Sequence, residues 1–206
     1  MKAFRWLPLT LLLGVALTAC GGGEKAFTVT SVREIVLQPS EAPSGTDYVN
    51  EQSGPVPLEQ FFSTDEERAK LKELGLEGIY NSSFATPGLF PLPEDLSKLA
   101  PNAHFIGSNA VVFKDADGAH EATRFEEQTV FPEVTKGRQD VKVEGLGEDA
   151  VGFKFVAFRS FPVPGVFYGF RVGNALFAVV AVGVPGSVTA EEALALAQKV
   201  AARARQ

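Results

Sequence analysis

The sequence predicts an α+β domain in which helices pack on an antiparallel β-sheet of four to six strands. Three observations support this fold class. Apolar and polar residues alternate in the second half of the chain, as at Val151, Phe153 and Phe155. A Gly173–Asn174 pair lies between two β-type runs, which is typical of a hairpin turn. Residues 189–206 carry the clearest helical pattern of the chain.

The C-terminal helix has a marked start and one apolar face. Thr189 and Glu192 have the spacing of a capping box, in which each side chain bonds the other residue's backbone N–H. Apolar residues recur every three or four positions, at Ala193, Leu196, Ala197, Val200, Ala201 and Ala204. Because most of these are alanines, we expect the helix to lie close against the sheet.

The first twenty residues have the layout of a secretory signal. Lys2 and Arg5 precede an apolar run over residues 7–17, and small residues follow it. An eleven-residue helix spans only about 16 Å, whereas the hydrocarbon core of a bilayer is about 30 Å thick. The run therefore favours a cleaved signal over a membrane-spanning helix.

The stretch "LTAC", residues 17–20, resembles the lipobox of bacterial lipoproteins. The resemblance implies cleavage between Ala19 and Cys20 and a diacylglycerol on the Cys20 sulfur. It divides the chain into a signal peptide (1–19), a lipidated tether (20–26) and one α+β domain (27–206). The membrane would then be a partner through Cys20, at the extracytoplasmic face of a bacterial cell membrane or outer membrane. An ordinary cleaved signal is the alternative.

Composition excludes two classes of protein. Cys20 is the only cysteine among 206 residues, so no intramolecular disulfide stabilises the fold. The formal charge is −6, and removal of Lys2 and Arg5 with the signal makes it −8. Because no basic run follows the signal, nucleic acid is not an expected partner.

The remaining elements are expected in a simple order. In the first half these are a strand over Phe27–Leu37, a Pro/Gly-rich loop over 38–57, and a helix over 63–75 capped by Ser63 or Thr64. Residues 76–88 suggest a loop or short extended piece, and residues 92–100 a helical turn. A strand at Ala110–Phe113 runs into a helix capped by Asp115 or Asp117, with Ala119, Ala122 and Phe125 on one face. Further strands are expected at Val141 and Val143, at 151–155 and on both sides of the hairpin turn.

No catalytic motif stands out, and we expect no enzyme and no catalytic residue. The Gly–x–Ser–x–Gly and Ser–x–x–Lys patterns are absent from the sequence. A histidine-assisted serine site would need His104 or His120 beside a serine, and the candidates are Ser82, Ser83 and Ser108. No spacing supports such a pair.

No metal or cofactor site is expected either. The stretch "DADGAHE", Asp115–Glu121, begins like a calcium loop, but Gly118 is fourth where glycine belongs sixth, and Ala119 occupies a ligand position. An aspartate cap is the better interpretation. The stretch "GLGEDAVGF" lacks the Lys–Ser or Lys–Thr of a phosphate-binding loop, which favours a tight turn.

Aromatic residues are concentrated between positions 153 and 170. They are Phe153, Phe155, Phe158, Phe161, Phe167, Tyr168 and Phe170, and "ALFAVVAVGV" downstream is apolar on both faces. One interpretation is a central strand covered by the C-terminal helix. The other is a cleft for an apolar ligand or an envelope protein, with the loop Phe161–Phe167 at its rim.

The stretches "VVFKDADGAHEA", "GLGEDAVGF" and "FRVGNALFAVV" resemble small extracytoplasmic lipoprotein and sensor-type domains of bacteria. That resemblance implies an α+β fold and a binding or sensing role. The expected function is therefore a membrane-anchored module that binds or senses a ligand. An envelope hydrolase and a structural accessory of an envelope complex are the alternatives. A histidine bonded to a serine or carboxylate in a cleft would favour the hydrolase, and a flat apolar patch the accessory.

Overall fold

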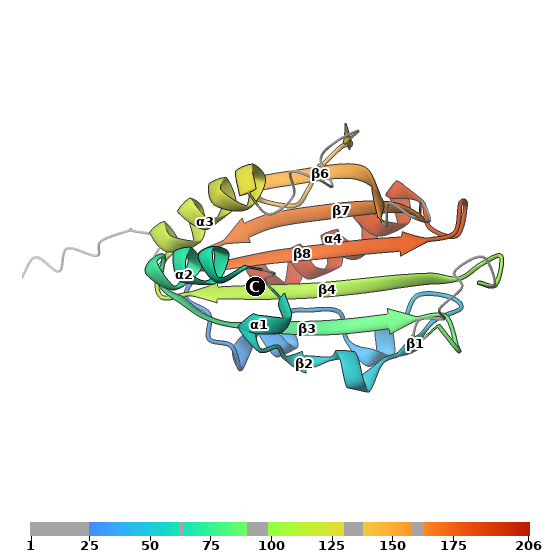
Figure 1. The fold of residues 1–206 in the computed structure, drawn as a ribbon, viewed down its shortest axis with the longest axis horizontal. Helices are drawn as coiled ribbons and strands as arrows, with labels where there is room; N and C mark the ends of the chain where they lie inside the picture. Colours follow the sequence, from blue (N-terminus) through green and yellow to red (C-terminus); the bar gives the residue numbers. More distant parts are fainter. Residues whose placement is uncertain (1–24, 62–63, 90–98, 130–137, 158–162) are drawn as a thin grey trace, which may run out of the picture.

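The protein is an α+β domain built on one antiparallel sheet of eight strands in the order β1-β3-β4-β8-β7-β6-β5, with β2 also paired to β3. The structure, a computed structural model, describes residues 25–206 except 62–63, 90–98, 130–137 and 158–162. Five long strands form the body of the sheet (Figure 1): β3 (Leu76–Ala85), β4 (His104–Phe113), β6 (Glu148–Ala157), β7 (Val163–Val172) and β8 (Ala175–Gly183).

The prediction of four to six strands was too small. Three strands of two residues each extend the edges: β1 (Asp47–Tyr48), β2 (Gly54–Pro55) and β5 (Gln139–Asp140). A pair of residues is too short to show alternation, so such strands leave no signal in the sequence. The strand predicted at Val141 and Val143 is wrong, because the strand in this part of the chain, β5, ends at Asp140.

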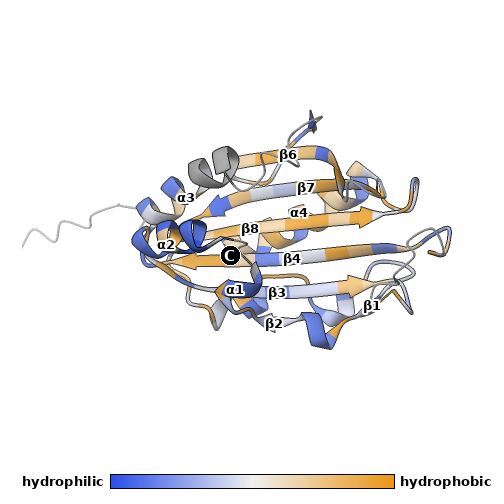
Figure 2. Ribbon diagram, viewed as in Figure 1, coloured by the Kyte–Doolittle hydropathy of each residue, from blue (hydrophilic) through white to orange (hydrophobic). Residues whose placement is uncertain are grey.

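Helices cover both faces of the sheet. Helix α4 (Ala190–Arg205) lies behind it in Figure 1, whereas α2 (Asp65–Glu73) and α3 (Ala116–Thr129) lie in front, and a short helix, α1, spans Leu58–Phe61. Successive residues of β4 therefore face two separate cores. Val112 packs with α4, and Val111 packs with α2 and α3. Strand β8 is hydrophobic along its length and α2 is largely hydrophilic (Figure 2).

The N-terminal segment, residues 25–41, covers the part of the sheet that α4 leaves open. Its side chains Phe27, Val32, Val36 and Leu37 are buried in the same core as α4. The predicted strand Phe27–Leu37 is wrong, since Ser31–Glu34 is a 3₁₀ helix. The hydroxyls of Thr28 and Ser31 bond each other's backbone N–H and so favour a turn over an extended chain.

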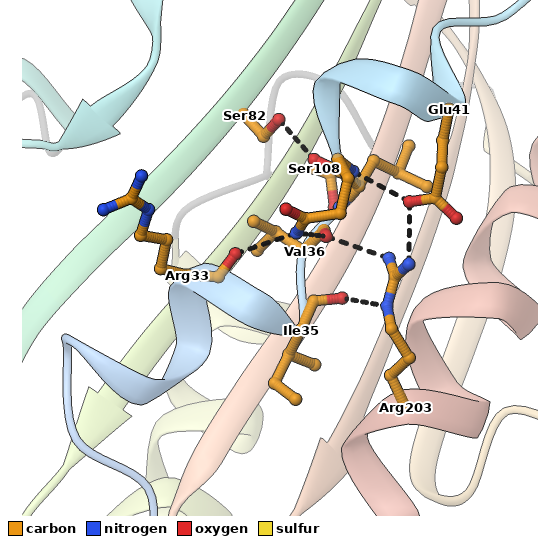
Figure 3. Close-up of polar contacts among 9 residues, drawn as sticks. Arg33, Ile35, Val36, Glu41, Ser82, Ser108 and Arg203 are labelled. Atoms are coloured by element: carbon orange, nitrogen blue, oxygen red, sulfur yellow. Dashed lines mark hydrogen bonds and ion pairs between the residues drawn. The ribbon is translucent and has the colours of Figure 1, made fainter.

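Polar contacts hold this segment in place (Figure 3). Leu37 N–H donates to Ser108 Oγ at 3.2 Å, and Ser82 Oγ donates to the Leu37 carbonyl at 2.6 Å. These two serines lie on β3 and β4 and are buried. Residues 76–88, expected as a loop or short extended piece, therefore contain a ten-residue strand. Polar residues such as Ser82 and Ser83 are typical of a turn, but in this strand their hydroxyls bond backbone carbonyls.

The Pro/Gly-rich loop 38–57 lies along the free side of β3. It contains β1 and β2, in which Tyr48 pairs with Phe84 and Gly54 with Asn81. Two 3₁₀ helices, Pro39–Glu41 and Asn50–Gln52, separate these pairings. The loop therefore completes the edge of the sheet.

Five local predictions are confirmed. Thr64 begins α2 and Thr189 begins α4, each in a complete capping box. Asp115 precedes α3, and its Oδ1 accepts the Gly118 N–H at 2.9 Å. Gly173–Asn174 joins β7 to β8, and the predicted alanine-rich face of α4 is buried. Most of the turn predicted at 92–100, and the side chain of Phe125, lie outside the described residues.

Candidate functional site

A cavity of about 330 Å³ lies where β7 and β8 meet the start of α4. Its walls come from β6, β7, β8 and the β8–α4 connection, at the right-hand end of the sheet in Figure 1. The lining is mostly apolar and consists of Lys154, Phe155, Pro164, Gly165, Val166, Ala181, Gly183, Val184, Gly186, Val188, Thr189, Ala190 and Glu191.

Hydrogen bonds hold the α4 side of this cavity in place. The capping box of Thr189 and Glu192 sets the first residue of α4, and Tyr168 Oη donates to the Ala190 carbonyl at 3.1 Å. Burial, together with the negative charge of Glu191, raises the pKa of Tyr168, so its hydroxyl stays protonated and keeps donating. The start of α4 is thereby attached to β7 beside the cavity.

Phe155 packs closely over Gly165 on the face of the sheet away from α4. A methyl group on Gly165 would lie 2.5 Å from Phe155 Cζ, so only glycine leaves room for the ring in this position. The two residues pair across β6 and β7, and they border the cavity from the opposite face to Lys154 and Val166.

Polar groups occur at few places around the cavity. Lys154 and Glu191 are both exposed and supply one positive and one negative charge to the wall. The Ser187 Oγ, in the β8–α4 connection, is buried without a hydrogen-bond partner among the described residues, but Ser187 does not line the cavity. A half-open, mostly apolar hollow with a few polar groups suits a small ligand with an apolar body.

The predicted aromatic cluster divides between the two faces of the sheet. Phe153 stacks on Phe167 with ring centroids 5.0 Å apart and meets Phe155 edge-on at 6.1 Å. Tyr168 and Phe170 point to the other face, into the α4 core. The first interpretation is confirmed for β8, which is a central strand packed against α4. The second, a binding cleft, stays a prediction.

The rim loop Phe161–Phe167 was predicted wrongly in one respect. Strand β7 begins at Val163 and passes through Pro164 and Gly165, which line the cavity. Proline is tolerated there because it lies one residue from the start of the strand. Phe158 and Phe161 lie outside the described residues, as do Ala19 and Cys20.

His104 contacts Thr86 and the backbone of Asn102. It is buried, and its Nδ1 lies 2.7 Å from the Asn102 carbonyl oxygen and 3.3 Å from Thr86 Oγ1. Ser82 and Ser108 bond the Leu37 backbone, and Ser83 Oγ donates to the Gln52 carbonyl at 3.1 Å. In the described part of the chain, none of these three serines bonds a histidine.

His120 belongs to an ionic cluster that the sequence did not indicate. Its Nδ1 lies 2.8 Å from Asp149 Oδ2, which also accepts the Arg171 Nε–H at 2.8 Å. Burial alone would raise the pKa of Asp149, but the hydrogen bonds from Arg171 and His120 outweigh it and hold that pKa below its ordinary value. Asp149 has a φ of 48°, an uncommon conformation for a residue other than glycine.

The His120 cluster joins α3 to β6 and β7 and lies outside the cavity. A histidine–carboxylate pair orients a general base in many hydrolases, but such a site also needs a nucleophile within reach. No hydroxyl or thiol bonds His120 among the contacts that the structure describes. The contacts of the pair attach the helix to the sheet.

The Asp115–Glu121 stretch behaves as a helix start. Asp115 accepts the Gly118 N–H, as expected of a cap. Within the described ranges, no three His, Cys, Asp or Glu side chains gather in a way that could hold a metal ion.

Comparisons with known proteins show the fold. No protein-family model and no curated protein matches the sequence. The class that the structure defines is an α+β domain built on one antiparallel sheet, and a solved structure shares this fold. That structure is the extracellular domain of PknH from Mycobacterium tuberculosis, which is 15% identical with a TM-score of 0.52, over 89% of this chain and 99% of that one. In the described residues, no helix has the length and apolarity to cross a membrane.

Proposed function

We propose that the chain is a lipid-anchored, extracytoplasmic module that binds a small amphiphilic ligand in the cavity between β7, β8 and α4. The observation that carries the proposal is the cavity itself, of about 330 Å³, with mainly apolar walls. Binding rather than catalysis is proposed because the hydrogen bonds described for His104 and His120 go to backbone, Thr86 or Asp149, and none of them goes to a serine.

The lining supports a ligand with an apolar body and one polar end. Val166, Val184 and Val188 would cover the body and displace water from it, at about 25 cal/mol for each Å² of apolar surface buried. Lys154 or Glu191 would pair with the polar end at the exposed side. The sign of the ligand's charge decides which of the two residues acts.

Two observations support the location. The lipobox-like "LTAC" precedes the domain, and Cys20 is the only cysteine in the chain. The fold is shared with an extracellular domain. Two or three acyl chains on one residue hold a protein to a bilayer durably, because each buried methylene contributes about 0.8 kcal/mol.

The ligand site is tested by filling the cavity with Val188→Trp. The matched control is Val156→Trp, because Val156 is 59% exposed and does not line the cavity. Binding of an anionic probe (8-anilinonaphthalene-1-sulfonate) and of a cationic amphiphile is measured by fluorescence. We expect Val188→Trp to weaken binding of at least one probe several-fold and Val156→Trp to leave it unchanged. Equal binding by both variants would refute the site.

The polar end is tested by charge reversal. Lys154→Glu should weaken binding of the anionic probe and strengthen binding of the cationic one. Lys114→Glu makes the same charge change at an exposed residue outside the cavity and should leave binding of both probes unchanged.

The anchor is tested by Cys20→Ser. The parent should incorporate radioactive palmitate in a bacterial host, and the variant should not. Labelling of both to the same extent would remove the anchor from the proposal and leave the ligand site standing.

A further inference from the structure

We propose that the anchored protein stands with its β7–β8 turn toward the bilayer and its cavity toward the aqueous side. The proposal rests on the lipid anchor of the proposed function. It concerns the surface that meets the membrane and the route by which the ligand arrives. We call the end with Gly173–Asn174 the turn end, and the opposite end, where α4 begins, the cavity end.

The chain enters the fold at the turn end and is held there by one side chain. Asn174 Oδ1 accepts the Phe27 N–H at 2.6 Å, and its Nδ2 donates to the Phe27 carbonyl at 3.0 Å. The same Nδ2 donates to the Phe113 carbonyl at 2.5 Å, at the end of β4. The Asn174 N–H also donates to the Lys25 carbonyl at 3.3 Å. Asn174 is buried, so residues 25–27 are fixed to the turn.

Close packing at Gly173 reinforces this attachment. A methyl group on Gly173 would overlap the Lys25 carbonyl, since its carbon would lie 1.7 Å from that oxygen. Gly173 has a φ of 55°, which glycine adopts readily. The backbone of Lys25 therefore lies directly on the turn, and Phe27 continues into the core against Phe177, with ring centroids 5.4 Å apart.

The tether is too short to bring the anchor to the cavity. Five residue steps from Cys20 to Lys25 span at most about 17 Å. Seven steps along β7 from Gly173 to Val166, which lines the cavity, span about 23 Å, and Pro164 lies further still. While residues 25–27 remain attached, the acylated sulfur stays near the turn end.

Charge opposes an arrangement in which the body lies flat on the lipid. The chain without its signal carries −8, which anionic headgroups repel. The cavity end bears the exposed Glu191 and Glu192 in the first turn of α4, whereas Arg203 and Arg205 lie in its last turn. Although Asp115 and Asp117 add negative charge near the turn end, only that end is attached to the lipid.

This orientation restricts the source of the ligand. A cavity that opens away from the bilayer takes up a molecule dissolved in the aqueous phase or delivered by another envelope protein. It does not extract a lipid from the leaflet that holds the anchor. The ligand class is therefore a water-borne amphiphile.

Site-specific fluorescence quenching tests the orientation. Because Cys20 is acylated, a cysteine introduced elsewhere takes the label selectively. Lys114→Cys places a fluorophore at the turn end, and Pro185→Cys places one beside the cavity; both positions are exposed. The full acylated protein is reconstituted into vesicles of phosphatidylethanolamine and phosphatidylglycerol that contain a headgroup-nitroxide lipid.

We expect the label at position 114 to be quenched several-fold more than the label at position 185. Equal quenching would show a flat arrangement, and the reverse order would show an inverted one; either result overturns the proposal. Vesicle flotation separates the two levels of failure. If the protein does not float with the vesicles, the proposed anchor is refuted. If it floats and both labels are quenched equally, only the proposed orientation is refuted.

A longer tether provides a second test. Insertion of ten Gly and Ser residues between Gly23 and Glu24 leaves every described residue unchanged but frees the body to turn. The difference in quenching between the two labels should shrink in this variant. An unchanged difference would mean that the tether length does not set the orientation.

Discussion

The guanidinium of Arg203 joins the last helix to the N-terminal segment through Glu41. Arg203 Nη1 donates to Glu41 Oε2 at 2.7 Å, while Nε and Nη2 donate to the carbonyls of Ile35 and Val36 at 3.0 and 2.9 Å (Figure 3). Glu41 Oε2 also accepts the Gln38 N–H at 2.8 Å. One side chain thus fixes two backbone groups and one carboxylate of the segment that covers half of a sheet face.

Arg203→Ala should destabilise the protein by about 2 to 4 kcal/mol, because it leaves two carbonyls and a carboxylate without their charged donor. Urea unfolding measures the change. Arg205→Ala is the control, since Arg205 is exposed and its Nη2 donates only to the Gly145 carbonyl among the contacts described. We expect that control to lose less than about 1 kcal/mol. Similar losses in both variants would contradict a specific role for Arg203.

The contribution of Glu41 should depend on pH. Burial by itself raises the pKa of the Glu41 carboxyl, but the hydrogen bonds from Gln38 and Arg203 outweigh it, and the pKa lies below its ordinary value of 4.5. A carboxyl whose pKa is lowered by folding stabilises the folded state above its unfolded pKa and loses that effect as the pH falls through the folded pKa. Glu41→Gln should therefore be less stable than the parent at pH 7, and the difference should shrink below pH 4.5. A difference that is constant with pH would show that the charge of Glu41 contributes nothing.

Asn174→Ala should destabilise the fold and free the entry of the chain. The substitution leaves the Phe27 N–H and the Phe27 and Phe113 carbonyls without their partner inside the core, which costs about 2 to 4 kcal/mol. Hydrogen exchange should show loss of protection at the Phe27 amide before global unfolding. Asn50→Ala, at an exposed asparagine, should change stability by less than about 0.5 kcal/mol.

Gly165→Ala should lower the stability of the fold without closing the cavity. The new methyl group would lie 2.5 Å from Phe155 Cζ, at the outer end of a ring that can rotate away, and both groups lie on the face of the sheet away from α4. We expect a loss of about 1 to 2 kcal/mol in urea unfolding and unchanged binding of the fluorescent probe. A several-fold weaker binding would contradict the placement of the site on the α4 face. Gly107→Ala, which meets Val180 at 3.1 Å outside the cavity, should behave in the same way.

The elements that sequence predicts well are those whose signals are local. Thr64 and Thr189 are separated from their capping partners by three residues, and Gly173–Asn174 forms its turn from two. The face of α4 follows from a repeat within one helix. In each case the residues that decide the structure lie within a few positions of one another, so the sequence alone is sufficient to predict the element.

The elements that sequence misses depend on distant partners. Ser82 in the middle of β3 resembles a turn residue until the Leu37 carbonyl, 45 residues away, accepts its hydroxyl. The N-terminal segment alternates like a strand near Phe27, but it packs on a face of the sheet and pairs with no strand among the described residues. The cavity combines residues of three strands and a helix start. The sequence indicated Phe155, the stretch Phe161–Phe167 and the apolar strand 175–184, but not the start of α4.

The attachment of Phe27 to Asn174 spans 147 residues, and that of Ile35 to Arg203 spans 168. A chain synthesised from its N-terminus exposes Phe27 long before either partner has been made. The N-terminal segment therefore stays uncovered until the last helix is complete. Because such distant contacts close late, folding is expected to be slow and to finish only after the final helix is available. Any acyl transfer to Cys20 would then act on a nascent, still extended substrate.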